Sequence, residues 1–147
     1  MKLAELQAKV GEVIGTSDWM EITQDRIALF ADATDDHQFI HVDPDQAKQT
    51  PFGQTIAHGF LSLSLLVSLL ESCGPKPEMS MMVNYGLNKL RFLAPVKSGK
   101  RIRARFKLLE MVEKRPGQWQ QTLEATVDIE GEDKPALIAE WVLLLFE

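Results

Sequence analysis

The feature of the sequence that most constrains the fold is the apolar stretch from Ile56 to Leu70, in which nearly every residue is Leu, Val, Phe, Ala or a small Ser. Projected at about 100° per residue, its apolar groups point to every side of a helix, so we expect a helix that is buried all round. Serines and Glu71 interrupt the run, which is shorter than the roughly 20 apolar residues that a membrane crossing needs. The stretch therefore predicts the core helix of a soluble domain.

Two residues at the start of this helix, His58 and Gly59, indicate more than a structural role. A glycine lets another molecule approach the backbone closely. The first N–H groups of a helix have no acceptor within the helix, and they favour an anion or a developing negative charge. Helix propensity also predicts that alanine in place of Gly59 folds at least as well as glycine, with a gain of up to about 1 kcal/mol.

Length and composition indicate one globular domain that spans residues 1–147. A chain of this length with 45% apolar and 25% charged residues can bury a sizeable core. The net charge of −5 argues against a general nucleic-acid binder. The single cysteine, Cys73, excludes an internal disulfide, and the segment Met1–Gln7 lacks the apolar core of a signal peptide. We therefore expect a cytoplasmic protein that acts neither on nucleic acid nor in a membrane.

The second half of the chain alternates apolar and polar residues, most clearly in Arg101–Leu108 and Thr122–Ile129. This pattern predicts an antiparallel sheet with one apolar and one wet face. The apolar face and the apolar helix bury each other if the sheet wraps around the helix, so we predict an α+β fold. The expected strands are Met79–Tyr85, Lys89–Val96, Arg101–Leu109, Trp119–Ile129 and Ala136–Phe146.

The last expected strand, from Leu137 to Phe146, carries apolar residues on both faces, with Trp141 among them. One sheet face covers only one side of such a strand, so the pattern suggests that another subunit covers the other side. The edges of wrapped sheets also tend to pair with each other. We therefore expect a homodimer.

Asp36 and His41 form a candidate catalytic pair. Residues five apart lie about 140° round a helix axis, so these two share a site only if the chain turns between them. A helix capped near Thr23 is expected to stop at about Asp36, and Asp43–Pro44 indicates the start of another helical turn. A carboxylate and an imidazole in a partly desolvated site can hold and polarise a water molecule. The residue types leave open that Asp36 caps a turn and His41 is an ordinary loop histidine.

A metal site is the other interpretation of these residues, because His37 and His41 are four apart and Asp43 and His58 are further possible ligands. The signal is weak, since the chain has neither a cysteine ligand nor a His-Glu-x-x-His pattern. Pro44 would also break a helix that displays both histidines. We expect no metal.

The segments Ala33–Pro44, with the sequence ATDDHQFIHVDP, and Thr55–Phe60, with the sequence TIAHGF, resemble the MaoC-like hotdog proteins, the (R)-specific enoyl-CoA hydratases. The resemblance covers nearly the whole chain and is strongest to the NodN-like subgroup. The usual family pattern is Asp-x-Asn-Pro-x-His, and this chain has Gln38 and Phe39 in place of the Asn and Pro. The catalytic pair is intact, whereas the loop between its members must be braced differently.

The resemblance implies a hotdog fold, in which an antiparallel sheet wraps around a long central helix. It implies that Asp36 and His41 are catalytic and that the backbone N–H of Gly59 binds the thioester oxygen. The implied reaction adds water to a trans-2-enoyl-CoA thioester and gives an (R)-3-hydroxyacyl-CoA, with no cofactor beyond the coenzyme A of the substrate. Members of the family pair as dimers whose acyl groove follows the subunit boundary.

Two other functions stay open, an acyl-CoA thioesterase and a non-catalytic protein that binds acyl thioesters, because fold alone does not separate them. The spacing of Asp36 and His41 favours the hydratase, since a thioesterase would not need a histidine at that position. Phe39, Phe60 and the methionines of Met79–Met82 are candidates for lining an acyl tunnel.

The basic residues on the expected strands have two possible roles: they bind the phosphates of coenzyme A, or they form a charged, solvent-exposed face of the sheet. The coenzyme A ligands therefore stay unassigned. The basic residues in question are Lys89, Arg91, Arg101, Arg103, Arg105 and Lys107.

Overall fold

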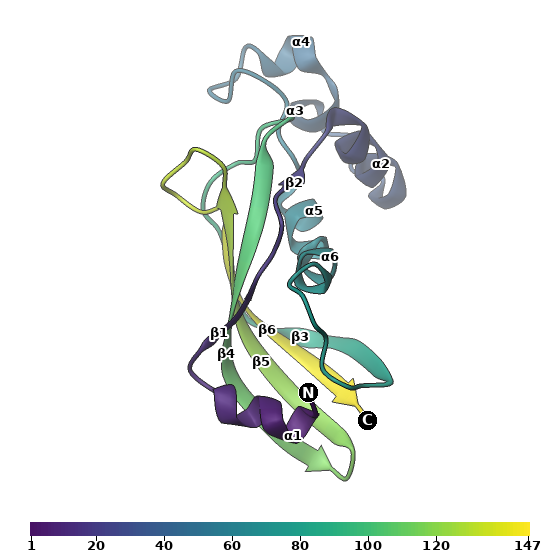
Figure 1. The fold of residues 1–147 in the computed structure, drawn as a ribbon. Coiled ribbons are helices and arrows are strands. Elements are labelled where there is room, and N and C mark those ends of the chain that lie inside the picture. The colour runs from purple at the N-terminus through teal and green to yellow at the C-terminus, as the bar shows by residue number, and fades with distance from the viewer.

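An antiparallel sheet curves around a central helical segment, as the α+β prediction requires (Figure 1). The computed structural model describes residues 1–147. Neighbouring strands follow the order β1-β4-β5-β6-β3, and β2 also pairs with β4. The strands are β1 Val13–Thr16, β2 Met20–Glu21, β3 Met81–Phe92, β4 Arg101–Arg115, β5 Gln118–Ile129 and β6 Leu137–Phe146. The α-helices are α1 Leu3–Leu6, α2 Gln24–Thr34, α3 Phe39–Val42, α4 Pro44–Ala47, α5 Gly59–Ser64 and α6 Leu66–Glu71.

The alternation in β4 and β5 gives the sheet its two faces, as predicted. Phe106 on β4 lies opposite Ala125 on β5, and both side chains are fully buried. On the outer face Arg105 forms an ion pair with Asp128, and Arg101 forms one with Glu130. These arginines therefore have carboxylate partners within the sheet, which is the role of a wet outer face.

Two strand boundaries differ from the prediction. Gly86 was expected to separate two strands, but β3 runs through it without a turn, with irregular register between Asn84 and Gly86 and between Leu87 and Lys89. A glycine inside a strand often marks such a bulge, because it accepts the local bend. At the other end of the sheet, β4 continues to Arg115 and turns at Gly117, whose φ is 73°.

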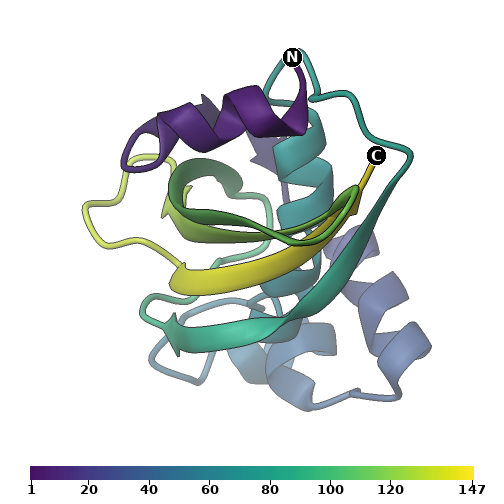
Figure 2. The ribbon, with the colours of Figure 1, turned by 90° about the horizontal axis from the view of Figure 1, so that it is seen from below.

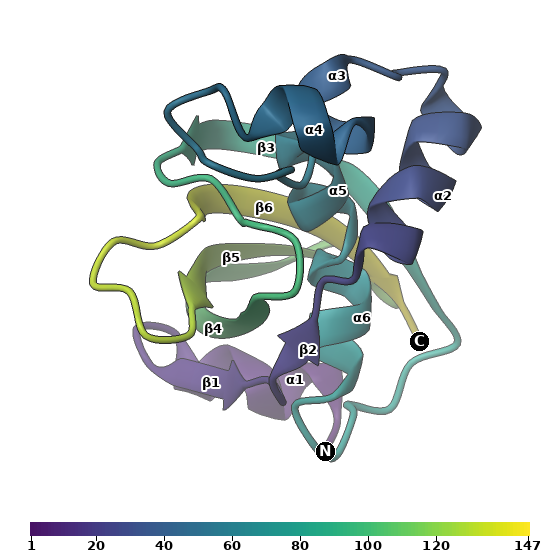
Figure 3. The ribbon, with the colours of Figure 1, turned by 90° about the horizontal axis from the view of Figure 1, so that it is seen from above.

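The central helix is shorter than predicted and is not buried all round. It begins at Gly59 rather than Ile56, and it is interrupted at Leu65 (Figures 2 and 3). Its inner side, including Leu61, Leu66 and Leu69, packs in the core. Its outer side is exposed, because the sheet covers only one side of the helix; the exposed residues are Phe60, Ser64, Ser68 and Glu71. None of the helices is long and apolar enough to cross a membrane.

One edge of the sheet is β3 and the other is formed by β1 and β2, whereas the last strand, β6, lies between β5 and β3. The apolar row that lacks a cover is therefore on β3 rather than on the last strand. On the second face of β6, Val142 is 4% exposed and only Ile138 is largely open, at 39%. The exposed row on β3 consists of Met81, Val83 and Tyr85, whereas Leu87, beyond the bulge, lies opposite Trp141 on the helix-facing side of the sheet.

Candidate active site

The turn between Asp36 and His41 is built by the end of α2. Thr23 caps the start of this helix by accepting a hydrogen bond from the backbone N–H of Arg26. The helix ends at Asp35, which adopts a left-handed conformation with φ 58° and donates its N–H to the carbonyl of Ala31. A left-handed residue at this position reverses the chain direction. The chain therefore turns between Asp36 and His41, and the two residues do not share one helix. The flanking sequence signals predicted this turn.

His41 lies on the short helix α3, with its side chain directed into the interior. The residue is only 6% exposed, and its Nδ1–H donates to the backbone carbonyl of Ile56 at 2.7 Å. Because a carbonyl only accepts, Nε2 carries the free lone pair of the neutral ring. Burial lowers the pKa of His41; the neighbouring His58 also lowers it, while the hydrogen bond to Ile56 and the charge of Asp36 act in the opposite direction. The imidazole is therefore poised as a neutral base at neutral pH.

Asp36 is exposed, and the turn brings it to His41. A carboxylate oxygen of Asp36 lies within 4.8 Å of a ring nitrogen of His41. A single water molecule can bridge two polar groups at that separation, because each hydrogen bond spans about 2.8 Å. The carboxylate also accepts a long hydrogen bond, 3.4 Å, from the backbone N–H of Gln38. Asp36 thus braces its own turn and faces the histidine at the same time.

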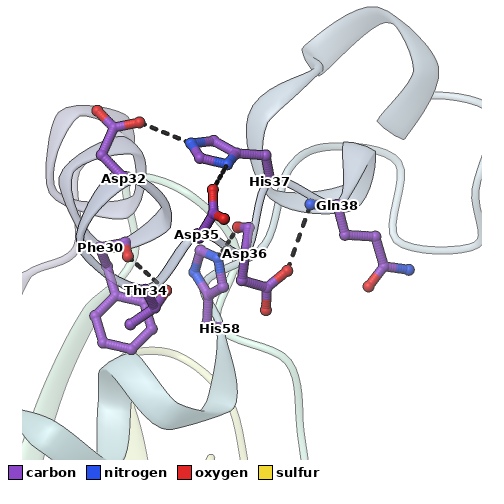
Figure 4. Close-up of polar contacts among 8 residues, drawn as sticks. All are labelled: Phe30, Asp32, Thr34, Asp35, Asp36, His37, Gln38 and His58. Atoms are coloured by element: carbon purple, nitrogen blue, oxygen red, sulfur yellow. Dashed lines mark hydrogen bonds and ion pairs between the residues drawn. The ribbon is translucent and has the colours of Figure 1, made fainter.

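His58 is the residue of this site that the sequence did not single out for the reaction. Its ring stacks on that of His41, with centroids 3.7 Å apart and an angle of 22° between the planes. Its Nε2–H donates to the backbone carbonyl of Asp36 at 3.0 Å (Figure 4). The only sequence signal for this role was the position of His58 directly before Gly59.

The three side chains Asp36, His41 and His58 offer ligand atoms close together, but their arrangement does not fit a metal ion. His41 Nδ1 and His58 Nε2 are already committed to backbone carbonyls. The remaining ring nitrogens have lone pairs in two nearly parallel planes, so they do not converge on one point as tetrahedral coordination requires. His37 is also unavailable to such a centre, because it binds Asp32 at 2.8 Å and lies near Asp35 at 3.5 Å (Figure 4).

Gly59 is the first residue of α5, so its N–H has no acceptor within the helix. It lies on the wall of an open cavity of about 440 Å³, together with His41. The aromatic ring of Phe92 packs over Gly59, and a Cβ added there would lie 2.9 Å from ring carbons. Alanine at Gly59 therefore requires the ring of Phe92 to shift, a contact that helix propensity does not take into account.

The cavity beside His41 is mostly apolar, and much of its wall follows β3 in the chain. Of the residues proposed for an acyl tunnel, Phe60 lines it, whereas Met79 and Met82 line a separate cavity of about 90 Å³. Phe39 lines neither cavity. The loop after β3 carried no sequence signal for this role. The cavity is lined by His41, Phe52, Ile56, Ala57, Gly59, Phe60, Ser62, Phe92, Leu93, Ala94, Pro95, Val96 and Ala136.

The antiparallel sheet and the central helix that it curves around form a hotdog fold. The model of the MaoC-like domain matches residues 5–131, and the chain belongs to the MaoC-like dehydratase family of hydro-lyases. Its relatives include nodulation protein N of Rhizobium leguminosarum bv. viciae, which is 48% identical over 147 residues, 99% of this chain and 91% of that protein.

Two further comparisons support the same family. The 3-hydroxyacyl-thioester dehydratase Z of Mycobacterium tuberculosis is 48% identical over 141 residues, which cover 96% of this chain and 93% of that protein. The solved structure of the (R)-hydratase of A. caviae involved in PHA biosynthesis superposes with a TM-score of 0.74 at 27% identity, over 90% of this chain and 95% of that one. The resemblance seen in the sequence is thereby confirmed.

The contrasting surroundings of His37 and His41 predict two separate titrations. The hydrogen bond that His37 donates to the Asp32 carboxylate raises the pKa of His37, whereas burial lowers the pKa of His41. In a ¹⁵N-edited NMR titration of the side chains, His41 is expected to lose its charge at lower pH than a free histidine, and His37 at higher pH. Replacing Asp32 by Asn serves as the control, since it is expected to lower the pKa of His37 only. Coincident titration of the two rings would contradict this electrostatic picture.

Proposed function

We propose that this protein is an (R)-specific enoyl-CoA hydratase, which adds water to trans-2-enoyl-CoA and gives (R)-3-hydroxyacyl-CoA. The observation that carries the proposal is that the Asp36 carboxylate lies within 4.8 Å of a ring nitrogen of His41, whose ring lines an apolar cavity and has its Nε2 lone pair free. The names of the relatives support it, because dehydration of a 3-hydroxyacyl thioester is the reverse of this hydration. The reaction requires no cofactor besides the coenzyme A of the substrate.

In the proposed reaction His41 acts as the general base. A water molecule bound between Asp36 and His41 gives a proton to His41 Nε2 while its oxygen bonds to C3 of the substrate. The electron pair of the C2=C3 bond moves toward the thioester, whose oxygen becomes enolate-like. The imidazolium of His41 then returns its proton to C2, which completes the addition of water. The Asp36 carboxylate orients the water and stabilises the transient positive charge on the ring.

The proposed partner of the enolate oxygen is the backbone N–H of Gly59. This group lies on the same cavity wall as His41, and no acceptor within α5 competes for it. A helix N-terminus favours developing negative charge, and one preformed donor of this kind contributes on the order of 3 kcal/mol to the transition state. The side chain of Phe92 covers this position, so we expect its ring to turn aside or to pack on the bound thioester.

The thioesterase and the binding protein are the alternatives to this proposal. A thioesterase would hydrolyse the thioester and release free coenzyme A. A binding protein would catalyse neither hydration nor thioester hydrolysis. Crotonyl-CoA separates the three functions in one assay, in which the absorbance of the conjugated thioester and the appearance of free thiol are followed in parallel. The hydratase is expected to remove the conjugated absorbance without releasing thiol. Release of thiol at the same rate would assign the thioesterase instead.

The first prediction from this mechanism concerns the catalytic pair. Asp36→Asn and His41→Ala are each expected to lower kcat by about 10²- to 10⁴-fold, the usual contribution of a positioned acid or base. The matched control is His37→Gln, because His37 adjoins Asp36 in the chain but turns toward Asp32. The measurement is the crotonyl-CoA assay on variants with unchanged circular dichroism. Unchanged turnover in either pair variant would reject the proposed roles.

A second prediction tests the N–H of Gly59 with two substitutions that add the same Cβ. Gly59→Ala keeps the N–H group, whereas Gly59→Pro removes it. Proline suits the first position of a helix, and the preceding residue, His58, already has the extended conformation that proline requires, with φ −60° and ψ 138°.

The proline variant is expected to have a kcat roughly 100-fold lower than that of the alanine variant, the scale of losing one oxyanion donor. Because both variants meet Phe92, each is also measured with Phe92→Leu to separate the steric effect of the Cβ. Equal activity of the proline and alanine variants in both backgrounds would show that the N–H is not the donor.

We also propose that the protein works as a homodimer that pairs along β3. This twelve-residue strand is an edge of the sheet, so one side of its backbone has no strand partner. The row of Met81, Val83 and Tyr85 is between 39% and 66% exposed, and a second copy related by twofold symmetry would cover it.

The dimer predicts a mass in light scattering of twice 16.6 kDa. Tyr85→Glu, which places a charge within the apolar row, is expected to shift the mass to that of the monomer. Leu29→Glu is the matched control, since Leu29 is 69% exposed and Tyr85 66%, but Leu29 lies on α2. A monomeric wild type at micromolar concentration would refute the dimer.

A further inference from the structure

His58 lies at the centre of the site, yet the proposed reaction assigns it no proton and no bond to the substrate. The residue is 3% exposed. Its ring contacts two aromatic neighbours, His41 at 3.7 Å and Phe30 at 4.9 Å between centroids. Its Nε2–H reaches the carbonyl of Asp36, as Figure 4 shows. One buried side chain therefore contacts both members of the catalytic pair.

The second nitrogen of this ring shows that packing alone does not explain the residue. Because Nε2 donates to a carbonyl, the neutral ring has its proton on Nε2 and a lone pair on Nδ1. His58 Nδ1 is buried and has no hydrogen-bond partner in the chain. A phenyl ring would occupy similar space without an unsatisfied polar atom, which typically costs on the order of 1–3 kcal/mol. What a phenyl ring cannot supply is the hydrogen bond to Asp36.

We propose that His58 is a positioning residue, which fixes the backbone of Asp36 through Nε2–H and the imidazole of His41 through its ring face. The proposal rests on the proposed hydratase function for its effect on activity, but the two contacts stand independently of that function. His58 is also the cap residue of α5, directly before Gly59. It thus links the water-binding pair to the proposed oxyanion donor.

The hydrogen bond to Asp36 matters because the rest of this turn is exposed. The carboxylate of Asp36 has only the 3.4 Å contact with Gln38, and the backbone is otherwise held by the bond from Asp36 N–H to the Ala31 carbonyl. Misplacing a reacting group by about 1 Å can cost roughly 100-fold in rate. Loss of the His58 anchor is therefore expected to lower kcat much more than it changes KM.

The ring face of His58 has a different effect, which is on the protonation of His41. The titratable groups that face His41 are Asp36 and His58, and burial is the main reason for the lowered pKa of His41. A ring that covers one face of the imidazole keeps water from that face. Removing the ring is therefore expected to raise the pKa of His41 toward its ordinary value.

Two substitutions separate these effects. His58→Phe keeps the ring and removes the donor, whereas His58→Gln keeps a donor near the place of Nε2 and removes the ring. In the crotonyl-CoA assay, His58→Phe is expected to lower kcat by roughly 100-fold with little change in KM. In an NMR titration, the pKa of His41 is expected to rise further in His58→Gln than in His58→Phe.

A double-mutant cycle distinguishes positioning from general destabilisation. His58→Phe is expected to lower kcat far less in an Asp36→Asn background, because the group that it positions is already impaired. An equal loss in both backgrounds would overturn the positioning role, and so would an unchanged kcat in His58→Phe.

The wild-type spectrum provides a test that needs neither a variant nor activity. The ¹⁵N shifts of His58 are expected to show a neutral ring protonated at Nε2, with that proton protected from exchange. A ring protonated at Nδ1, or one in rapid exchange, would overturn the proposal even if the substitutions prevented folding. If the wild type does not hydrate crotonyl-CoA but shows these signals, the hydratase function fails while the two contacts of His58 stand.

Discussion

The short segment Ile56–Ala57 is the junction on which the site depends. The carbonyl of Ile56 accepts the Nδ1–H of His41, and its N–H donates to the carbonyl of Ile40. Ala57 in turn donates to the carbonyl of Val96, in the loop after β3. Buried backbone groups must find partners, so this segment has little freedom to move. It therefore ties α3, the start of α5 and the loop after β3 into one rigid unit.

The consequence for the chemistry is that one carbonyl decides which nitrogen of His41 can react. With Nδ1 engaged, the lone pair is on Nε2 at the wall of the cavity. Burial then favours the neutral ring, while the exposed Asp36 supplies charge from the solvent side. In the proposed reaction, a buried base and an exposed carboxylate divide the two tasks, because only the base must be uncharged before it accepts a proton.

The fold supplies this arrangement with few structural elements. The sheet covers one side of α5 and α6 and leaves the other side, with Phe60, open next to the cavity. The edge of β3 and the loop that follows it bring Phe92 over Gly59. An exposed aromatic side chain over a helix N-terminus is compatible with a site that binds a long, partly apolar ligand and must admit it from solvent.

The sequence by itself determined the fold class and the family, and it singled out Asp36 and His41 as the proposed catalytic pair. Local sequence patterns predict three features: the alternation of β4 and β5, the apolar stretch before Leu70 and the helix cap at Asp43. Each pattern has a periodicity or a residue type that is visible within a few neighbouring residues. The resemblance to the MaoC-like family implied roles for Asp36, His41 and Gly59. All three roles remain proposals.

Only the tertiary structure decided how the helix is covered, which strands are the edges of the sheet, and what surrounds the catalytic pair. The helix that the sequence predicted to be buried all round is exposed on one side, because the sheet covers only the other. The order and curvature of the strands depend on contacts between distant residues. The ring of Phe92 over Gly59 joins positions 33 residues apart (92 minus 59), and the bond from His58 to Asp36 spans a separation of 22. Contacts at such distances have no periodic signature in a single sequence, so no local pattern could reveal them.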